Sequence, residues 1–130
     1  MFRVDYDARA NVLTIHVSGF LTPDDVPAFA AEIAATARAA AAIRADFDVI
    51  VESLDFPVQA NDVADLLAQI MRDGIVLTSG NAAVVVGSQL NKLQAERTLA
   101  HPRLKVFRTM AEATDWLGRT SGDAQQRAAG

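Results

Sequence analysis

The chain has 130 residues, of which 51% are hydrophobic, and its formal net charge is -4. A chain of this length buries roughly two thirds of the surface that it exposes when unfolded, which predicts a single domain. The negative charge argues against a nucleic-acid partner, and the lack of cysteine excludes disulfides, thiol nucleophiles and thiolate metal sites.

The N-terminal sequence predicts no export signal. After Met1 the chain runs into an alternating charged pattern, without the basic segment and apolar core of a secretory signal. The long alanine-rich stretch 28–42 is interrupted by Glu32, Thr36 and Arg38, so it falls short of the roughly 20 apolar residues that span a bilayer. We therefore expect a cytoplasmic protein without a transmembrane segment.

Two strands open the chain. Apolar and polar residues alternate over residues 2–7 and again over 12–18, which is the period of two expected for half-buried strands. The short link 8–11 predicts an antiparallel hairpin, and Gly19 ends the second strand.

A long helix follows. Thr22 offers an N-cap hydroxyl, Pro23 suits the first helical position, and Asp24 and Asp25 favour the positive end of the helix dipole. The predicted apolar stripe consists of Val26, Phe29, Ile33, Ala37 and Ala40.

Two apolar segments, 47–54 and 82–86, predict strands that are covered on both faces. Between them we expect a second helix, capped by Asn61 and closed by Gly74 in the left-handed conformation. Its predicted core-facing stripe consists of Val63, Leu66, Leu67, Ile70 and Met71.

The third predicted helix covers residues 89–100, with Ser88 as its N-cap and His101-Pro102 as its stop. Its expected apolar anchors are Leu90, Leu93 and Leu99.

A short strand over 104–107 comes next, and a capping box from Thr109 to Glu112 opens a terminal helix. That helix carries Ala113, Trp116 and Leu117 as its apolar residues. Because residues 119–130 contain no apolar anchor larger than alanine, we expect a disordered tail there.

This order of elements, ββαβαβαβα, predicts a single α/β domain over residues 1–118. Helices that alternate with strands require crossovers between parallel strands, so we expect a mixed, mostly parallel sheet of about five strands with four helices.

Side chains suited to catalysis or metal binding are sparse. His16 and His101 lack the spacing of a known metal motif, and Ser53, Ser79 and Ser88 lack a nucleophile elbow or phosphate loop. Asp48 and Glu52 share one strand face but would lie about 13 Å apart, which is too far for an acid-base pair. We therefore expect no enzyme, no metal and no cofactor.

The chain resembles STAS-like domains in its order of elements and in three segments: YDARANVLTIHVSGFLTPDDV, FDVIVESLDF and LKVFRTMAEATDWLG. It is most similar to the anti-sigma factor antagonist-related (SpoIIAA-like) branch, which is also connected with CRAL-TRIO lipid-transfer folds. The resemblance covers about residues 2–118.

The resemblance implies a domain that works by binding another protein and not by covalent chemistry. Switch members of the family carry a phosphorylated serine or threonine at the start of the second helix. That position falls on Ala60 or Asn61 here, and no hydroxyl lies between Pro57 and Met71. The phosphorylation switch is therefore not carried over.

The entrance of the second helix and the loop before the fourth strand form our expected partner surface. The reason is that exposed helix N-termini at the C-terminal ends of parallel strands commonly bind ligands. The residues are Pro57, Val58, Gln59, Ala60, Asn61, Asp62, Ser79 and Asn81.

An alternative function is the carriage of a lipid or other apolar molecule between the sheet and the second and third helices, where small side chains leave space. A small anionic ligand is a further alternative, because Lys92, Arg97, Lys105 and Arg108 could form a modest basic surface. Size and composition leave a homodimer open.

Overall fold

The computed structural model describes the backbone of residues 1–129 and the side chains of residues 1–120. Within that range the elements are β1 (Phe2–Asp7), β2 (Val12–Val17), α1 (Asp25–Ile43), β3 (Asp48–Ser53), α2 (Asn61–Ile75), β4 (Ala82–Val86), α3 (Gln89–Thr98), β5 (Leu104–Phe107) and α4 (Met110–Ala129). The predicted order ββαβαβαβα is confirmed.

The five strands form one sheet in the sequential order β1-β2-β3-β4-β5. β1 and β2 are the antiparallel hairpin, and each later neighbour pairs in parallel. The predicted α/β class with a mixed, mostly parallel sheet is therefore confirmed.

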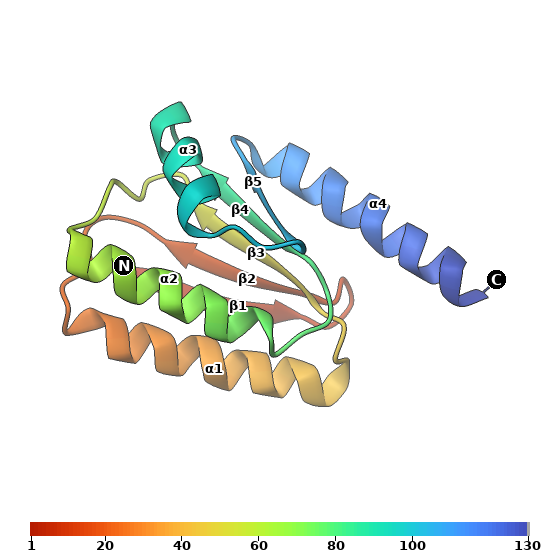
Figure 1. The fold of residues 1–130 in the computed structure, drawn as a ribbon. Coiled ribbons are helices and arrows are strands. Elements are labelled where there is room, and N and C mark those ends of the chain that lie inside the picture. The colour runs from red at the N-terminus through yellow and green to blue at the C-terminus, as the bar shows by residue number, and fades with distance from the viewer. Residues whose placement is uncertain (130) are drawn as a thin grey trace.

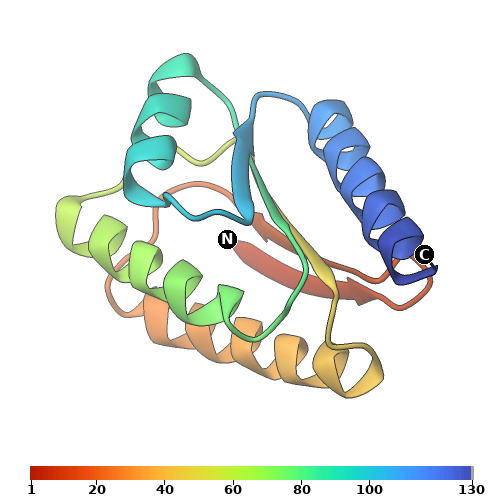
Figure 2. The ribbon, with the colours of Figure 1, turned by 45° about the vertical axis from the view of Figure 1, so that its right-hand side comes forward.

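The helices divide unequally between the two faces of the sheet (Figures 1 and 2). Each parallel strand is added on the same side of the one before it. Because crossovers between parallel strands are right-handed, α1, α2 and α3 must all lie on one face. Helix α4 follows the last strand and is free of this constraint, and it covers the other face.

The two faces carry separate hydrophobic cores. The larger core joins the sheet to α1 and α2 around Phe29, Phe47 and Val63, and the smaller one joins the sheet to α4 around Phe107 and Leu117. Strands β3 and β4 contribute to both cores, which explains why β4 is apolar throughout and fully buried.

Helix α1 is a core helix that is unusually apolar. Its 19 residues are long and apolar enough to cross a membrane by length and composition alone. In the structure its predicted stripe, including Phe29 and Ile33, is buried against the sheet. The high hydropathy is accounted for by this stripe and by the alanines around it.

The predicted cap position of α1 is wrong by two residues: the helix begins at Asp25, and its N-cap is Asp24, which makes no side-chain cap hydrogen bond. Thr22 and Asp25 nevertheless bond to each other at the start of the helix. The Thr22 hydroxyl accepts a hydrogen bond from the backbone N–H of Asp25 at 3.3 Å, and the Asp25 carboxylate accepts one from the N–H of Thr22 at 2.8 Å. The backbone N–H and the hydroxyl of Thr22 favour the ionised carboxylate, and together they lower the pKa of Asp25 from its ordinary value of 3.8.

Both predicted ends of α2 are wrong. The N-cap is Ala60, which has no side chain able to cap, and Asn61 is already the first helical residue. Gly74 lies within the helix, and its φ is not positive. The last non-helical residue before α2 is Ala60, with φ -58° and ψ 150°, so Ala60 and not Asn61 is at the N-cap position.

The predicted orientation of α3 is also wrong. Ser88 caps the helix as expected, by accepting a hydrogen bond from the N–H of Asn91. Leu90 and Leu93, however, are 59% and 53% exposed, and only Leu99 packs against the core. The leucine spacing indicates an apolar face, but the connections to β4 and β5 turn this face toward solvent.

The backbone is helical across the start of the expected tail at residues 119–130. Helix α4 continues to Ala129, since helical hydrogen bonds are local and need no apolar anchor. The Thr120 hydroxyl, for example, donates to carbonyl oxygens one turn earlier. Side chains beyond Thr120 lie outside the described residues, so the domain boundary at 118 stays a prediction.

Candidate functional site

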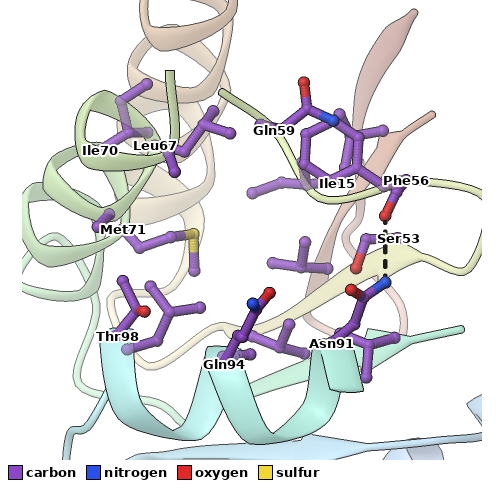
Figure 3. A pocket seen from close by; sticks show the side chains of 18 of the residues that line it. Ile15, Ser53, Phe56, Gln59, Leu67, Ile70, Met71, Asn91, Gln94 and Thr98 are labelled. Carbon is purple, nitrogen blue, oxygen red and sulfur yellow. Dashed lines mark hydrogen bonds between the residues drawn. The ribbon is translucent and has the colours of Figure 1, made fainter. Parts of the chain in front are cut away.

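A cavity of about 210 Å³ lies between the sheet and helices α1, α2 and α3. Figure 3 shows it from close by, with Gln59 on one side and Gln94 opposite, Met71 on α2, and Ile15 on the sheet. Strands β2, β3 and β4 form its floor near their C-terminal ends, where open α/β sheets commonly bind ligands.

The lining of the cavity is mostly apolar and carries no charged side chain. Of its 22 residues, 17 are apolar. The five polar residues are Ser53, Gln59, Asn91, Gln94 and Thr98.

The cavity stays open because small or polar residues occupy positions where larger apolar ones would fill it. On α2, Ala64 and Ala68 face the space beside Leu67. On α3, Ala95 and Gln94 occupy the inward side, and no residue of this helix is buried. The side of α3 that faces the sheet therefore does not close the core.

Two of the polar lining residues are satisfied within the protein. The Ser53 hydroxyl donates to the carbonyl oxygen of Val85 at 2.6 Å. The Gln59 carboxamide accepts from the N–H of Leu21 at 2.9 Å and donates to the carbonyl oxygens of Gly19 and Pro57. Gln59 thus ties the loop before α2 to the loop before α1 and fixes one wall of the cavity.

The other polar lining residues belong to α3 and are less engaged. The Asn91 carboxamide donates one long hydrogen bond, 3.5 Å, to the carbonyl oxygen of Phe56. The side chains of Gln94 and Thr98 have no hydrogen-bond partner among the described residues, and Figure 3 shows the Gln94 carboxamide directed into the cavity. These groups are available to a ligand.

The predicted site residues from Pro57 to Asp62 form one continuous wall of this region. Pro57, Val58 and Gln59 line the cavity, and Ala60, Asn61 and Asp62 are exposed at the start of α2. The Asp62 carboxylate accepts a hydrogen bond from the adjacent N–H of Val63, which is a local contact at the helix end.

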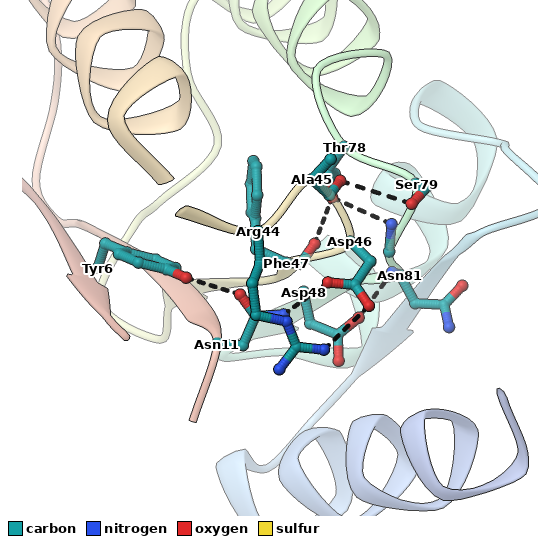
Figure 4. Close-up of polar contacts among 11 residues, drawn as sticks. Tyr6, Asn11, Arg44, Ala45, Asp46, Phe47, Asp48, Thr78, Ser79 and Asn81 are labelled. Atoms are coloured by element: carbon teal, nitrogen blue, oxygen red, sulfur yellow. Dashed lines mark hydrogen bonds and ion pairs between the residues drawn. The ribbon is translucent and has the colours of Figure 1, made fainter. Parts of the chain in front are cut away.

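Ser79 and Asn81 lie elsewhere, so the two halves of the expected surface do not adjoin. Both residues precede β4, at the opposite end of the parallel strands from Ser53, and Figure 4 shows them beside Ala45 and Asp48. The N–H of Asn81 donates to Asp48 at 2.9 Å, and the N–H of Ser79 donates to Ala45. The predicted order of elements already implied this separation, because in a parallel strand-helix-strand unit the helix starts beside the C-terminal end of one strand and the loop after the helix leads to the N-terminal end of the next.

The corner that contains Ser79 is tightly held. The buried Thr78 hydroxyl donates to the carbonyl oxygens of Ala45 and Phe47, and it accepts from the N–H of Gly80. The Arg103 guanidinium donates to the carbonyl oxygens of Thr78, Gly80 and Ile75. These internal contacts indicate a structural role for the corner.

Outside the cavity, charged side chains of β1, β2 and β3 form a cluster around His16. Nδ1 of His16 lies 3.3 Å from the Glu52 carboxylate, and Nε2 lies 4.0 Å from that of Asp5. Asp5 also pairs with Arg3 at 2.7 Å. Within the described residues, no group of three or more histidine or acidic side chains could hold a metal ion.

The sequence missed the polar residues of α3 that face the cavity. Asn91, Gln94 and Thr98 follow the i, i+3, i+7 spacing of one helix face, and this signal was present in the sequence. Three leucines on the same short helix indicated the opposite orientation. The stripe predicted for α2 is correct in part: Leu67, Ile70 and Met71 line the cavity and Val63 is buried in the core, whereas Leu66 is 44% exposed.

No protein-family model matches the sequence, and a search of curated proteins finds no matching relative. The fold and the site define the class of protein as a single α/β domain with a five-stranded, mostly parallel sheet and an apolar cavity on one face.

Proposed function

We propose that the domain is a non-enzymatic binding protein that holds a small apolar ligand in the cavity between the sheet and helices α2 and α3. The observation that carries this proposal is a mostly apolar, uncharged cavity of about 210 Å³ between the sheet and the helices, which is partly open to solvent. An engineered apolar cavity of about 150 Å³ already binds benzene.

The position of the cavity supports a binding role over a packing defect. It opens beside the C-terminal ends of parallel strands, and residues from four parts of the chain converge on it. The Gln59 carboxamide forms its three hydrogen bonds with the backbone of the loops before α1 and α2, which it holds together at the rim. Such an ordered rim indicates that the space is maintained.

Native mass spectrometry of freshly purified protein tests this function. We expect the wild type to carry an additional non-covalent mass. Ala95→Leu, which places a larger side chain into the cavity, should lose that mass and keep or gain stability, since filling a cavity removes its energetic cost.

The matched control is Ala39→Leu, which makes the same exchange at an exposed position of α1. It should retain the additional mass. Clean apo-protein from several expression hosts, or an identical mass on the Ala95→Leu variant, would count against the proposal.

A second candidate function is protein binding at the start of α2, as in a STAS-like regulatory domain that lacks the phospho-acceptor residue. In its favour, Ala60, Asn61 and Asp62 are exposed, the helix has no side-chain cap, and the neighbouring Val58 is 51% exposed. Its first backbone N–H groups and an apolar side chain thus face solvent together.

Asn61→Trp tests this second candidate. The exposed position should accept the larger side chain without unfolding, so the thermal midpoint stays unchanged while the set of proteins pulled down from a lysate loses a partner. Gln69→Trp, at an exposed position farther along α2, serves as the control. Identical partner sets for wild type and both variants would remove the idea.

A further inference from the structure

The free hydrogen-bonding groups of the cavity lie on one helix. Ser53 and Gln59 are bonded within the protein, which leaves the Asn91 oxygen, the Gln94 carboxamide and the Thr98 hydroxyl, all on α3. Asn91 is half-buried, whereas Gln94 and Thr98 line the cavity at its solvent-exposed rim. The sheet and α2 present apolar side chains from the opposite side. The cavity therefore has a polar side, formed by α3, and an apolar side, formed by α2 and the sheet.

The cavity lining provides no charged side chain that could pair with an ionised ligand. None of the lining residues is acidic, basic or histidine. Lys92 pairs with Glu96 at 3.4 Å, and the guanidinium of Arg108 donates to the Gly87 carbonyl. A carboxylate or phosphate in the cavity would lose hydration without gaining a counter-charge, which is strongly unfavourable.

The volume limits the size of the ligand. By the ratio that benzene sets in a cavity of about 150 Å³, this space holds roughly eight non-hydrogen atoms. Pockets for drug-sized molecules hold about 300–1,000 Å³. The cavity is open to solvent beside Val58, Gln94 and Thr98, so a long acyl chain would protrude from it, whereas a compact ring or branched chain fits within it.

We infer that the ligand is a compact, uncharged molecule with an apolar body and one neutral polar group, such as a ketone, an amide or an alcohol, which bonds to Gln94 and Thr98 on α3. This inference rests on the proposed function and narrows it. Carboxamide and hydroxyl side chains both donate and accept, so they suit a carbonyl as well as a hydroxyl. The apolar body contacts α2 and the sheet.

Three probes of equal heavy-atom number test the ligand class: acetophenone, isopropylbenzene and benzoate. Each is titrated into the full chain while the methyl signals of Ile15, Ile33 and Met71 are followed by NMR. The methyl signals of Ile50 and Leu117, on the opposite sheet face, report non-specific effects. We expect acetophenone to bind at least about tenfold more tightly than benzoate, because the ionised group finds no partner.

A double variant separates the hydrogen bond from the apolar contact. Gln94→Met with Thr98→Val removes both free polar groups and keeps similar side-chain volume. It should weaken acetophenone binding about threefold to tenfold, the range for a neutral hydrogen bond, and leave isopropylbenzene binding unchanged. Leu93→Met, on the exposed side of the same helix, should change neither affinity.

The outcomes distinguish the inference from the function on which it rests. Tighter binding of benzoate than of acetophenone overturns the neutral class, and equal effects of the double variant on both neutral probes overturn the contact with α3. In either case the cavity still binds small molecules. If no probe shifts the cavity methyl signals, the proposed function fails together with the inference.

Discussion

Two glycines of this chain meet opposite surroundings. A Cβ on Gly80 would overlap the backbone carbonyl oxygen of Phe47 and would come within 2.7 Å of that of Asp46. A Cβ on Gly74, in the last turn of α2, would meet nothing within 4 Å. Gly80 is thus required by the close approach of two backbones, whereas Gly74 is not required by its surroundings.

We predict that Gly80→Ala lowers the free energy of unfolding by about 1–3 kcal/mol, because backbone atoms cannot yield as a flexible side chain can. Gly74→Ala should raise it by about 0.5 kcal/mol, since alanine loses less conformational entropy in a helix. Urea denaturation of both variants measures the difference. Equal stability of the two variants would contradict the structure of this corner.

At the scale of elements, α3 differs from the other helices in having no buried residue. Leu90 and Leu93 point to solvent, and the larger core is joined only by Ala95 and the C-cap residue Leu99, both partly buried. Asn91, Gln94 and Thr98 line the cavity beside them. Helix α3 is therefore held by its short connections and by few apolar contacts.

We predict that Leu90→Ser and Leu93→Ser change the free energy of unfolding by less than about 0.5 kcal/mol, as is usual for exposed positions. Leu99→Ala should lower it by about 2 kcal/mol, the low end for a core leucine, because this side chain is only partly buried. Thermal denaturation of the three variants distinguishes the two orientations of α3. A large loss at Leu90 or Leu93 would favour the orientation expected from the leucine spacing.

At the scale of the whole molecule, the sequential strand order decides on which face of the sheet the cavity forms. Three crossovers in one direction gather α1, α2 and α3 on one sheet face, and the cavity forms beneath them. Helix α4 supports the other face through Ala113, Trp116 and Leu117. Among the side chains that the structure describes, these three carry the apolar packing of α4 on this face. The predicted domain boundary at residue 118 rests on the lack of larger apolar residues after it in the sequence.

Removal of residues 121–130 tests that boundary. We predict an unchanged thermal midpoint and an unchanged affinity for the neutral probes, because Ala113, Trp116 and Leu117 precede the cut and the removed segment contains no apolar residue larger than alanine. Trp116→Ala should by comparison lower the free energy of unfolding by about 2–3 kcal/mol, since it removes an aromatic side chain packed on Phe107 at 5.6 Å between ring centroids. A truncated chain as unstable as the Trp116 variant would place the tail within the domain.

The sequence by itself determined the elements and their order. Strand periodicity, the Ser88 cap and the apolar stripe of α1 are local patterns that depend on residues a few positions apart, so they could be predicted. The same holds for the apolar character of the cavity floor, which consists of buried strand residues.

Only the tertiary structure decided which helix faces turn inward and which loops meet. The orientation of α3 and the actual size of the cavity depend on packing between segments far apart in the chain. A cavity is the space that several elements fail to fill together, and no single segment encodes it. For that reason the sequence offered a space between the sheet and the second and third helices only as an alternative, and the polar residues of α3 that line it emerged only from the structure.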